Sequence, residues 1–324
     1  MSVNIRDLAR AAGVSVGTVS RALKQQPGLS ADTRARIVQL AQDMGYDQGR
    51  LRRDPIRKVL CLLHSAHGDP LANPFYSEVI TGARTFCLEN QLTCTVMSLQ
   101  PGKPVKRQVM HHEPDALLCI GFFEPETLAI LRSLGKPHVL SDMNAPDWPA
   151  VNTDNQQGAW LATRHLIDCG YKRIAFLSGS LAHYSIRLRE RGYRQALFDA
   201  GILADPALEA LIPPGMDIVD GAPVAMRELL ALPNPPDAVF AYNDATAIAA
   251  MRVCREAGLR IPQDIAFVGF DDLGAAAHVK PPLTTLAVDK TSLGYEAVSL
   301  LLDQQADVQR LLPVKLIVRE SSAA

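Results

Sequence analysis

The chain contains 324 residues, of which 48% are hydrophobic and 21% charged, and its formal net charge is −1 at pH 7. This length predicts two or three domains with enough apolar side chains for a sizeable core. No apolar run approaches the ~20 residues of a membrane helix, and the first residues lack a signal-peptide core, so we expect a cytoplasmic protein. The six cysteines lack paired metal-ligand spacing, so we expect reduced thiols, no metal and no cofactor.

The small net charge conceals an uneven distribution of charged residues. Residues 1–58 contain eleven Lys and Arg against five Asp and Glu, a net charge of +6, whereas residues 59–324 carry a net charge of −7. A basic segment ahead of an acidic body indicates that the N-terminal end of the chain meets a polyanion.

The N-terminal region predicts three short helices. Ile5–Ala12 has apolar residues at helical spacing, and Val16–Lys24 follows a glycine turn with Ser15 as its N-cap. Ser30 caps a third helix, which Gly45 ends. Two helices joined by a short turn that contains glycine form a helix-turn-helix, whose second helix enters the major groove of DNA.

The second predicted helix offers side chains suited to DNA. Hydroxyl groups bind phosphate oxygens, an arginine binds guanine or phosphate, and a valine contacts the thymine methyl group. The predicted DNA contacts of this helix are Ser15, Val16, Gly17, Thr18, Ser20 and Arg21. A three-helix structural cap is the alternative on pattern alone, and the basic charge favours DNA binding.

The remaining chain alternates strand-like and helical patterns. The predicted strands are Val59–His64, Leu92–Leu99, Ala116–Ile120, His138–Asp142, Ile174–Ser178, Ala238–Ala241 and Ile265–Phe270. The amphipathic segments between them include Phe75–Glu89, Asn155–Cys169, Arg187–Ala200 and Asp244–Ala257. This alternation predicts an α/β fold with two doubly wound parallel sheets, arranged as two lobes across a cleft that closes on a small molecule.

Side chains that follow the strand ends are the candidate ligand contacts, because small molecules bind outside the carboxyl ends of parallel strands. They are Asn73, Phe75, Asp142, Ser185, Arg187, Arg189, Asn243 and Asp271. Carboxylates, amides and an arginine fork can each bind two hydroxyls, and an aromatic face can cover a sugar ring, so this set suits a polyhydroxylated ligand. Asp and Asn at such positions also cap helices, and we interpret Asp154 and Asp244 as caps, with Asp272 as a further candidate cap.

The N-terminal motifs resemble those of a known family. The stretch from Asn4 to Tyr46 contains DLARAAGVS, GVSVGTVSRAL and a closing GY, and it resembles the head of the lactose-repressor (LacI/GalR) family. The resemblance extends along the whole chain and implies a helix-turn-helix head on a two-lobed body like a periplasmic binding protein. It also implies a homodimeric repressor of carbohydrate-metabolism genes, which binds double-stranded operator DNA and is controlled allosterically by a small sugar or sugar derivative.

The same resemblance implies a set of effector contacts. The segments NPFYSEVITGAR, SIRLRERGY, AYNDATAIAAMR and VGFDD resemble family segments that surround the effector. Carried over position by position, they imply contacts from Asn73, Phe75, Ser185, Arg189, Asn243 and Asp271, and Asp142 matches the family aspartate after the fourth strand. Val288 stands where several members place a polar or aromatic contact, so the identity of the effector does not transfer from any one member.

The linker departs from the family pattern. Relatives carry an Asn-x-x-Ala-x-x-Leu hinge helix that wedges a leucine into the minor groove, whereas residues 47–58 read DQGRLRRDPIRK and are about one helical turn shorter. Leu51 is the candidate wedge and Arg52 a candidate phosphate contact. A disordered basic linker is the alternative.

These observations predict three segments: a DNA-binding domain at 1–46, a linker at 47–58, and an effector-binding and dimerisation body at 59–324. The predicted lobes are 59–154 with 290–311, and 155–287 with 312–324. No heptad tail follows the body, so a dimer is expected, in agreement with a two-fold operator.

Other classes of function fit less well. No P-loop, G-x-G-x-x-G motif or nucleophile elbow supports an enzyme, and the pairs His64–His67 and His111–His112 lack a further ligand at metal spacing. The head and the missing signal peptide argue against a periplasmic sugar-binding protein. A family regulator controlled by a partner protein or by a non-sugar metabolite is the alternative, since the candidate ligand residues do not separate these cases.

Overall fold

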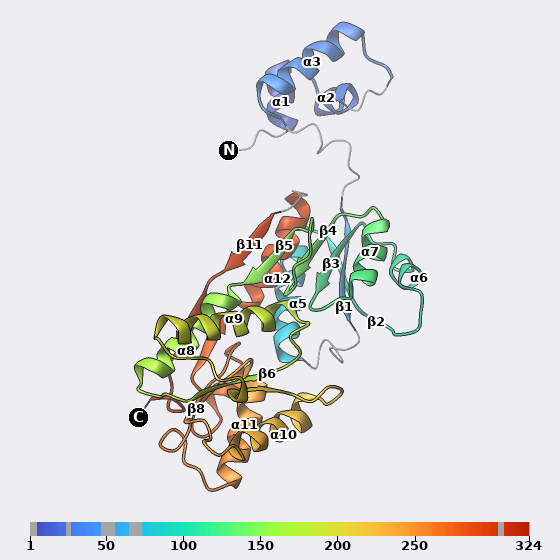
Figure 1. The fold of residues 1–324 in the computed structure, drawn as a ribbon. Helices are drawn as coiled ribbons and strands as arrows, with labels where there is room; N and C mark the ends of the chain where they lie inside the picture. Colours follow the sequence, from blue (N-terminus) through green and yellow to red (C-terminus); the bar gives the residue numbers. More distant parts are fainter. Residues whose placement is uncertain (1–4, 24–26, 47–55, 65–72, 304–307, 324) are drawn as a thin grey trace. The chain divides into compact units, whose positions relative to one another are not determined.

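The computed structural model describes residues 5–23, 27–46, 56–64, 73–303 and 308–323 (Figure 1). The chain divides into two compact units, residues 1–56 and 57–324. The first strand of the second unit begins at Lys58, which the predicted limits place in the linker. The candidate DNA contacts Leu51 and Arg52 lie outside the described residues, and the predicted domain and lobe limits remain proposals.

The described residues of the first unit form three helices, as the sequence predicts. They are α1 (Ile5–Ala12), α2 (Val16–Leu23) and α3 (Ala31–Asp43). Their apolar faces meet in one small core, to which Leu8, Val19 and Ile37 contribute fully buried side chains. Because each helix is short, this shared core is what stabilises the three of them.

The turns of the first unit also follow the sequence. Gly13 ends α1 with φ +66°, a conformation that favours glycine. The hydroxyl of Ser15 accepts a hydrogen bond from the Thr18 N–H at 3.1 Å, and that of Ser30 accepts one from the Thr33 N–H at 3.2 Å. Both predicted N-caps are therefore confirmed.

The second unit begins with a parallel six-stranded sheet in the order β11-β5-β4-β3-β1-β2. Its strands are β1 (Lys58–His64), β2 (Thr93–Leu99), β3 (Ala116–Ile120), β4 (His138–Ser141), β5 (Ala150–Thr153) and β11 (Gln309–Leu312). The helices that accompany it are α5 (Pro74–Glu89), α6 (Val105–Met110), α7 (Pro125–Ser133) and α12 (Lys290–Asp303). α5 and α12 pack against each other and against strands of this sheet.

A second parallel sheet has the order β7-β6-β8-β9. Its strands are β6 (Ile174–Ser178), β7 (Glu209–Leu211), β8 (Ala238–Ala241) and β9 (Ala266–Val268). Its helices are α8 (Asn155–Asp168), α9 (Tyr184–Asp199), α10 (Ile218–Leu230) and α11 (Asp244–Glu256), with 3₁₀ turns η2 (Pro206–Leu208) and η3 (Gly274–Ala277). An antiparallel ribbon of β10 (Thr285–Val288) and β12 (Val314–Ile317) completes the unit.

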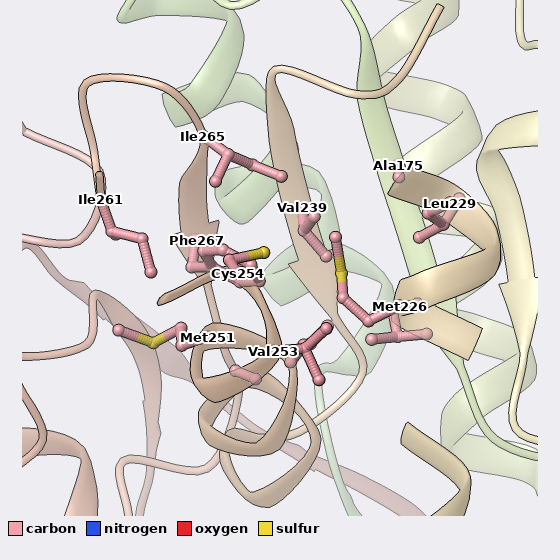
Figure 2. Packing of buried hydrophobic residues seen from close by; sticks show 14 of the residues in the cluster. Ala175, Met226, Leu229, Val239, Met251, Val253, Cys254, Ile261, Ile265 and Phe267 are labelled. Carbon is pink, nitrogen blue, oxygen red and sulfur yellow. The ribbon is translucent and has the colours of Figure 1, made fainter. Parts of the chain in front are cut away.

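Each of the two larger sheets has its own apolar core. In the second sheet, Val239 and Phe267 of the strands pack with Met226 of α10 and Met251 of α11, and all four are buried (Figure 2). The first sheet buries side chains of β1, β3 and β4 against α6 and α7. Burial of a side chain of this size contributes about 1.5–3 kcal/mol, so each sheet is stabilised by its own helices.

The predicted α/β fold with parallel sheets is confirmed, with corrections to individual elements. The sequence did not indicate β5, β7, β10, β11 or β12, which are each three or four residues long. α9 begins at Tyr184, three residues before the predicted Arg187, so Ser185 lies in its first turn.

α5 and α12 approach each other through their backbones. A Cβ added to Gly294 would lie 1.8 Å from the carbonyl oxygen of Val79, and one added to Gly82 would lie 1.9 Å from that of Thr291. Because the neighbours are backbone atoms, no side-chain rotation relieves such an overlap. The two glycines therefore set the distance between α5 and α12.

We expect Gly294→Ala to lower the free energy of unfolding of the body by ~1–3 kcal/mol or more, because overpacking forces the two helices apart. Urea titration followed by circular dichroism measures this change. Gly274→Ala is the control, since nothing lies within 4 Å of a Cβ at that position. A Gly294→Ala variant as stable as the parent would contradict the close helix contact.

Candidate functional site

α2 carries the side chains predicted to read DNA. The exposed members of the predicted set are Ser15, Val16, Gly17 and Arg21. Thr18 and Ser20 are half-buried, and the opposite face of the helix places Val19, Ala22 and Leu23 in the core of the unit. One face of α2 thus holds the unit together and the other offers polar groups to solvent.

Short-range hydrogen bonds order this exposed face. The hydroxyl oxygens of Ser15 and Thr18 lie 2.9 Å apart in a hydrogen bond, and Arg21 Nε donates to the Gly17 carbonyl at 3.4 Å. Val16 beside them is 41% exposed and is the apolar group that this face offers. Hydroxyls, a guanidinium and an exposed apolar group together match the requirements of a DNA groove.

In the second unit, two of the predicted effector residues, Asp142 and Asp271, lie close to Arg189, which is 5% exposed. Arg189 Nε donates to Asn155 Oδ1 at 2.8 Å, and its Nη1 donates to the Tyr242 carbonyl. Its Nη2 donates to Asp271 Oδ1 at 3.4 Å. The guanidinium also lies over the ring of Phe270, 3.7 Å from the centroid. Arg189 of α9 is therefore fixed by α8 and by the segments that follow β8 and β9.

Two aspartates at strand ends have unusual backbone conformations. Asp142, directly after β4, has φ +57°, and Asp271, after β9, has φ +109°. Residues other than glycine rarely adopt positive φ, and such a conformation costs about 1–3 kcal/mol. The surrounding contacts maintain this strain, as is typical of residues that face a ligand.

The carboxylates of this site are buried and electrostatically coupled. Burial raises the pKa of Asp271 to about 6, because Arg189 and Lys290 only partly offset the loss of solvation and the charge of Asp142 adds to it. Burial also raises the pKa of Asp142, against the opposing effects of Arg189, His183 and hydrogen bonds from Ser185 and Tyr76. Both carboxylates therefore gain from a ligand that donates hydrogen bonds to their oxygens.

Side chains from the two larger sheets meet at this point. The Tyr76 hydroxyl of α5 donates to Asp142 Oδ2 at 3.2 Å, and Ser185 of α9 donates to the same carboxylate. The rings of Phe122, after β3, and His183, before α9, have centroids 4.9 Å apart. Asp142, Ser185, Arg189 and Asp271 are thus brought together from separate parts of the sequence.

Three other predicted effector residues have structural contacts. Asn73 Oδ1 caps α5 by accepting from the Phe75 and Tyr76 N–H groups at 3.0 and 3.3 Å. Asn243 Oδ1 caps α11 by accepting from the Thr246 N–H at 2.9 Å. Phe75 is buried and packs edge-on against Tyr76. Both caps use the amide oxygen, and the side chain of Asn243 also hydrogen-bonds to Tyr242.

The sequence predicted that Asp154, Asp244 and Asp272 cap helices, which is confirmed for Asp154 and wrong for the other two. Asp154 caps α8 through the Gln157 N–H, as predicted. Asp244 is not a cap, because its carboxylate accepts hydrogen bonds from the Leu273 N–H at 2.7 Å and from the Thr285 hydroxyl. Asp272 binds Arg319 at 2.7 Å instead of capping a helix.

The sequence did not indicate several residues that build the site. Asn155 and Phe270 hold Arg189, and Tyr76 binds Asp142. Lys290, 5% exposed, donates to the carbonyl of Asp271 at 2.7 Å. The one available signal for Lys290 was its place at the start of a largely apolar helix. A lysine there is expected to be buried only if it has a partner.

A pocket of about 500 Å³ elsewhere on α8 and α9 does not include the predicted effector residues. It is lined by Gln156, Arg191, Arg194, Gln195, Phe198, Ile202, Leu203 and Ala204. Phe198 is 78% exposed, and Arg194 is bound by Glu190 and Glu209. This open pocket therefore does not coincide with the candidate effector residues around Arg189.

Within the described residues, no group of three His, Cys, Asp or Glu side chains is arranged to hold a metal ion. The described helices include none with the length and apolar character needed to cross a membrane. A helix-turn-helix unit followed by two parallel α/β sheets, with polar side chains gathered where the sheets meet, defines a ligand-responsive transcription regulator.

Comparison with known proteins identifies the family. Residues 4–48 match the model of the bacterial regulatory proteins of the lacI family, and residues 163–322 match a periplasmic binding protein-like domain. The HTH-type transcriptional repressor CytR of Escherichia coli strain K12 is 32% identical over 100% of this chain and 97% of its own length. The chain therefore belongs to the LacI family of regulatory proteins.

Solved structures agree with this assignment. The transcriptional regulator CelR in complex with cellobiose is 30% identical and covers 98% of this chain and 99% of its own, with a TM-score of 0.75. The lac repressor dimer bound to operator and an anti-inducer is 25% identical and covers 100% of both chains, with a TM-score of 0.73.

The buried carboxyl group of Asp244 predicts a specific pH dependence. Burial raises its pKa from 3.8 to about 8, with the charge of Asp271 adding to the effect. The folded chain therefore binds more protons than the unfolded chain between these pH values, so ionisation of Asp244 lowers the free energy of unfolding as pH rises through this window.

We expect Asp244→Asn, which mimics the protonated form, to remove this contribution. Urea titrations between about pH 5 and pH 8 should show a shallower loss of stability in the variant than in the parent. Asp154→Asn is the control, because Asn caps a helix as well as Asp does. Parallel stability curves for Asp244→Asn and the parent would show that Asp244 is ionised throughout.

Proposed function

We propose that this protein is a sequence-specific DNA-binding repressor of carbohydrate-metabolism genes, controlled by a small sugar or sugar derivative. It acts as a cytoplasmic homodimer and catalyses no reaction. The observation that carries the proposal is the convergence of Asp142, Arg189 and Asp271 at the meeting point of two sheets, in a chain that also contains a helix-turn-helix. Membership of a family of transcription regulators supports it.

The chemistry of the site supports a sugar as effector. Asp142 and Asp271 present carboxylate oxygens, and Arg189 holds one of them in place, so the site offers hydrogen-bond acceptors in a fixed geometry. Sugar hydroxyls donate to such acceptors, and hydrogen bonds to charged groups contribute about 1.5–3 kcal/mol each. The cellobiose complex of CelR supports the same class of ligand.

The first unit supports DNA binding. α2 exposes Ser15, Val16, Gly17 and Arg21, and residues 1–58 carry a net charge of +6. Ser20, Thr18, Leu51 and Arg52 complete the proposed set of contacts. The operator complex of the related lac repressor dimer supports a two-fold arrangement of two such heads.

The test of the proposal has two arms. Full-length protein selects DNA from a random library, and the recovered sites are expected to be near-palindromic. A thermal-shift screen compares neutral sugars, sugar phosphates and nucleosides, and a ligand at about 100 times its Kd should add ~2.7 kcal/mol of stability. Recovery of no DNA site contradicts the proposed regulator, and a thermal shift with none of these ligands contradicts control by a sugar or sugar derivative.

We expect Arg21→Ala to weaken binding to the selected site by ~1–3 kcal/mol, because a bidentate contact to guanine is lost. Fluorescence anisotropy at several salt concentrations measures the affinity and separates a base contact from a phosphate contact. Arg107→Ala, an exposed arginine of α6, is the control. An unchanged affinity in Arg21→Ala would remove this residue from the interface.

We expect Arg189→Lys to weaken effector binding about tenfold or more while operator affinity stays unchanged. An ammonium group cannot reproduce the fork that joins Asn155, the Tyr242 carbonyl and Asp271. Calorimetry with the ligand found in the screen measures the loss. Arg252→Lys, at an exposed position on α11 outside the candidate ligand set, is the control. Equal loss of both activities would assign Arg189 a structural role only.

A further inference from the structure

Three cysteines from distant parts of the sequence form a cluster beneath α5. Cys61 lies in β1, Cys94 in the adjacent strand β2 and Cys87 in α5. The sulfur atoms of Cys61 and Cys94 are 3.6 Å apart. The parallel register pairs Cys94 with Val59, two residues before Cys61, so both thiols point to the same face of the sheet.

The three thiols differ in their access to solvent. Cys61 and Cys87 are buried, whereas Cys94 is half-buried on β2, which is the edge strand of the six-stranded sheet. A small oxidant can therefore reach Cys94 first. The other three cysteines lie elsewhere. Cys119 belongs to the core on the opposite face of the sheet, Cys169 is an exposed residue after α8, and Cys254 of α11 is buried in the core of the second sheet.

The surroundings of Cys94 favour its thiolate. Hydrogen bonds from the thiols of Cys61 and Cys87, together with the charge of Arg84, lower the pKa of Cys94 against the opposing effect of burial. The same hydrogen bond and burial raise the pKa of Cys61. The thiolate is the form that reacts with peroxides, so the cluster contains one reactive sulfur and two neutral thiols beside it.

We propose that Cys94 is an oxidation site at which a hydroperoxide produces an intrachain disulfide with Cys61. The Cys94 thiolate attacks one peroxide oxygen, the O–O bond breaks, and hydroxide or alkoxide leaves to form Cys94 sulfenic acid. The Cys61 sulfur then attacks the Cys94 sulfur, the S–O bond breaks, and water leaves. Overall, two thiols and one hydroperoxide give one disulfide, one water and one further water or alcohol.

The geometry favours this product over a bound metal. Among the parts of the chain that the structure describes, no three such side chains are arranged as a metal site, whereas two of these sulfurs already touch. A relaxed disulfide needs α-carbons ~4.4–6.8 Å apart, and Cys94 is offset by two residues from Cys61 in the register of β1 and β2. Bond formation therefore draws β2 along β1, which an edge strand with one neighbour can accommodate.

The affected strands lie where the body begins. β1 starts at Lys58, and the N–H of Thr93, beside Cys94, donates to the carbonyl of Arg57 at 2.7 Å. A shift of β2 therefore acts on the residue that directly precedes the first strand. The oxidation site therefore lies beside the residue at which the second unit begins.

The experiment treats reduced full-length protein with stoichiometric hydrogen peroxide, blocks the remaining thiols under denaturing conditions, and maps the peptides by mass spectrometry. Trypsin leaves Cys61 in 59–84, and Cys87 and Cys94 together in 85–106. A second digestion, with a protease that cleaves after glutamate, cuts after Glu89 and separates Cys87 from Cys94. The digests thus distinguish all three pairings within the cluster.

We expect a Cys61–Cys94 link within one chain, formed before Cys169 is oxidised. Cys94→Ser should abolish the link, and Cys61→Ala should leave a Cys94 sulfenic acid that dimedone traps. Cys169→Ser is the control and should behave as the parent does. A link to Cys87, a link between two chains, or oxidation of Cys169 alone would overturn the proposal.

Discussion

One buried guanidinium organises the candidate effector site. Arg189 is fixed on one side by Asn155 of α8 and on another by the carbonyl that ends β8. Its third contact, to Asp271, joins a cation and a carboxylate that are both 5% exposed. Removing one member of such a buried pair typically costs about 3–5 kcal/mol, because the other charge is left without compensation. The edge of the second sheet is therefore built around this pair, and a ligand meets groups whose positions are already set.

The backbone of Asp271 is held as firmly as its side chain. Its N–H donates to the Leu286 carbonyl at 2.8 Å, and its own carbonyl accepts from Lys290 at 2.7 Å. These two bonds fix the residue at φ +109°, a conformation that a free chain avoids. Asp142 shows the same principle, since Tyr76 and Ser185 hold its carboxylate from two directions. The strain is thus maintained by contacts from β10, α12, α5 and α9, and not by local sequence.

Local signals in the sequence predicted much of the fold and part of the site. The helices of the first unit carried their caps at Ser15 and Ser30, and the central strands were continuous apolar runs, so both were found. The short strands β7 and β11 carry no such run and exist because a neighbouring strand supplies hydrogen bonds. Asn155 was likewise missed as a partner of Arg189, because that contact joins residues 34 positions apart through the packing of α8 on α9. A sequence pattern indicates which helix or strand a segment can form, whereas the contacts between distant residues depend on the tertiary fold.

Lys290 connects the ligand residues to the rigid part of the first sheet. Its ammonium group binds the Asp271 carbonyl and lies 3.7 Å from Glu78 of α5, and it is the first residue of α12. α12 in turn touches α5 backbone to backbone at Gly294 and Gly82, where neither helix can yield without separating. Because packed backbones move as units, the position of Asp271 is coupled through Lys290 to the N-terminus of α12 and, through it, to α5. α5 begins at the Asn73 cap beside Tyr76, which returns to Asp142, so the contacts form a closed loop around the candidate effector site.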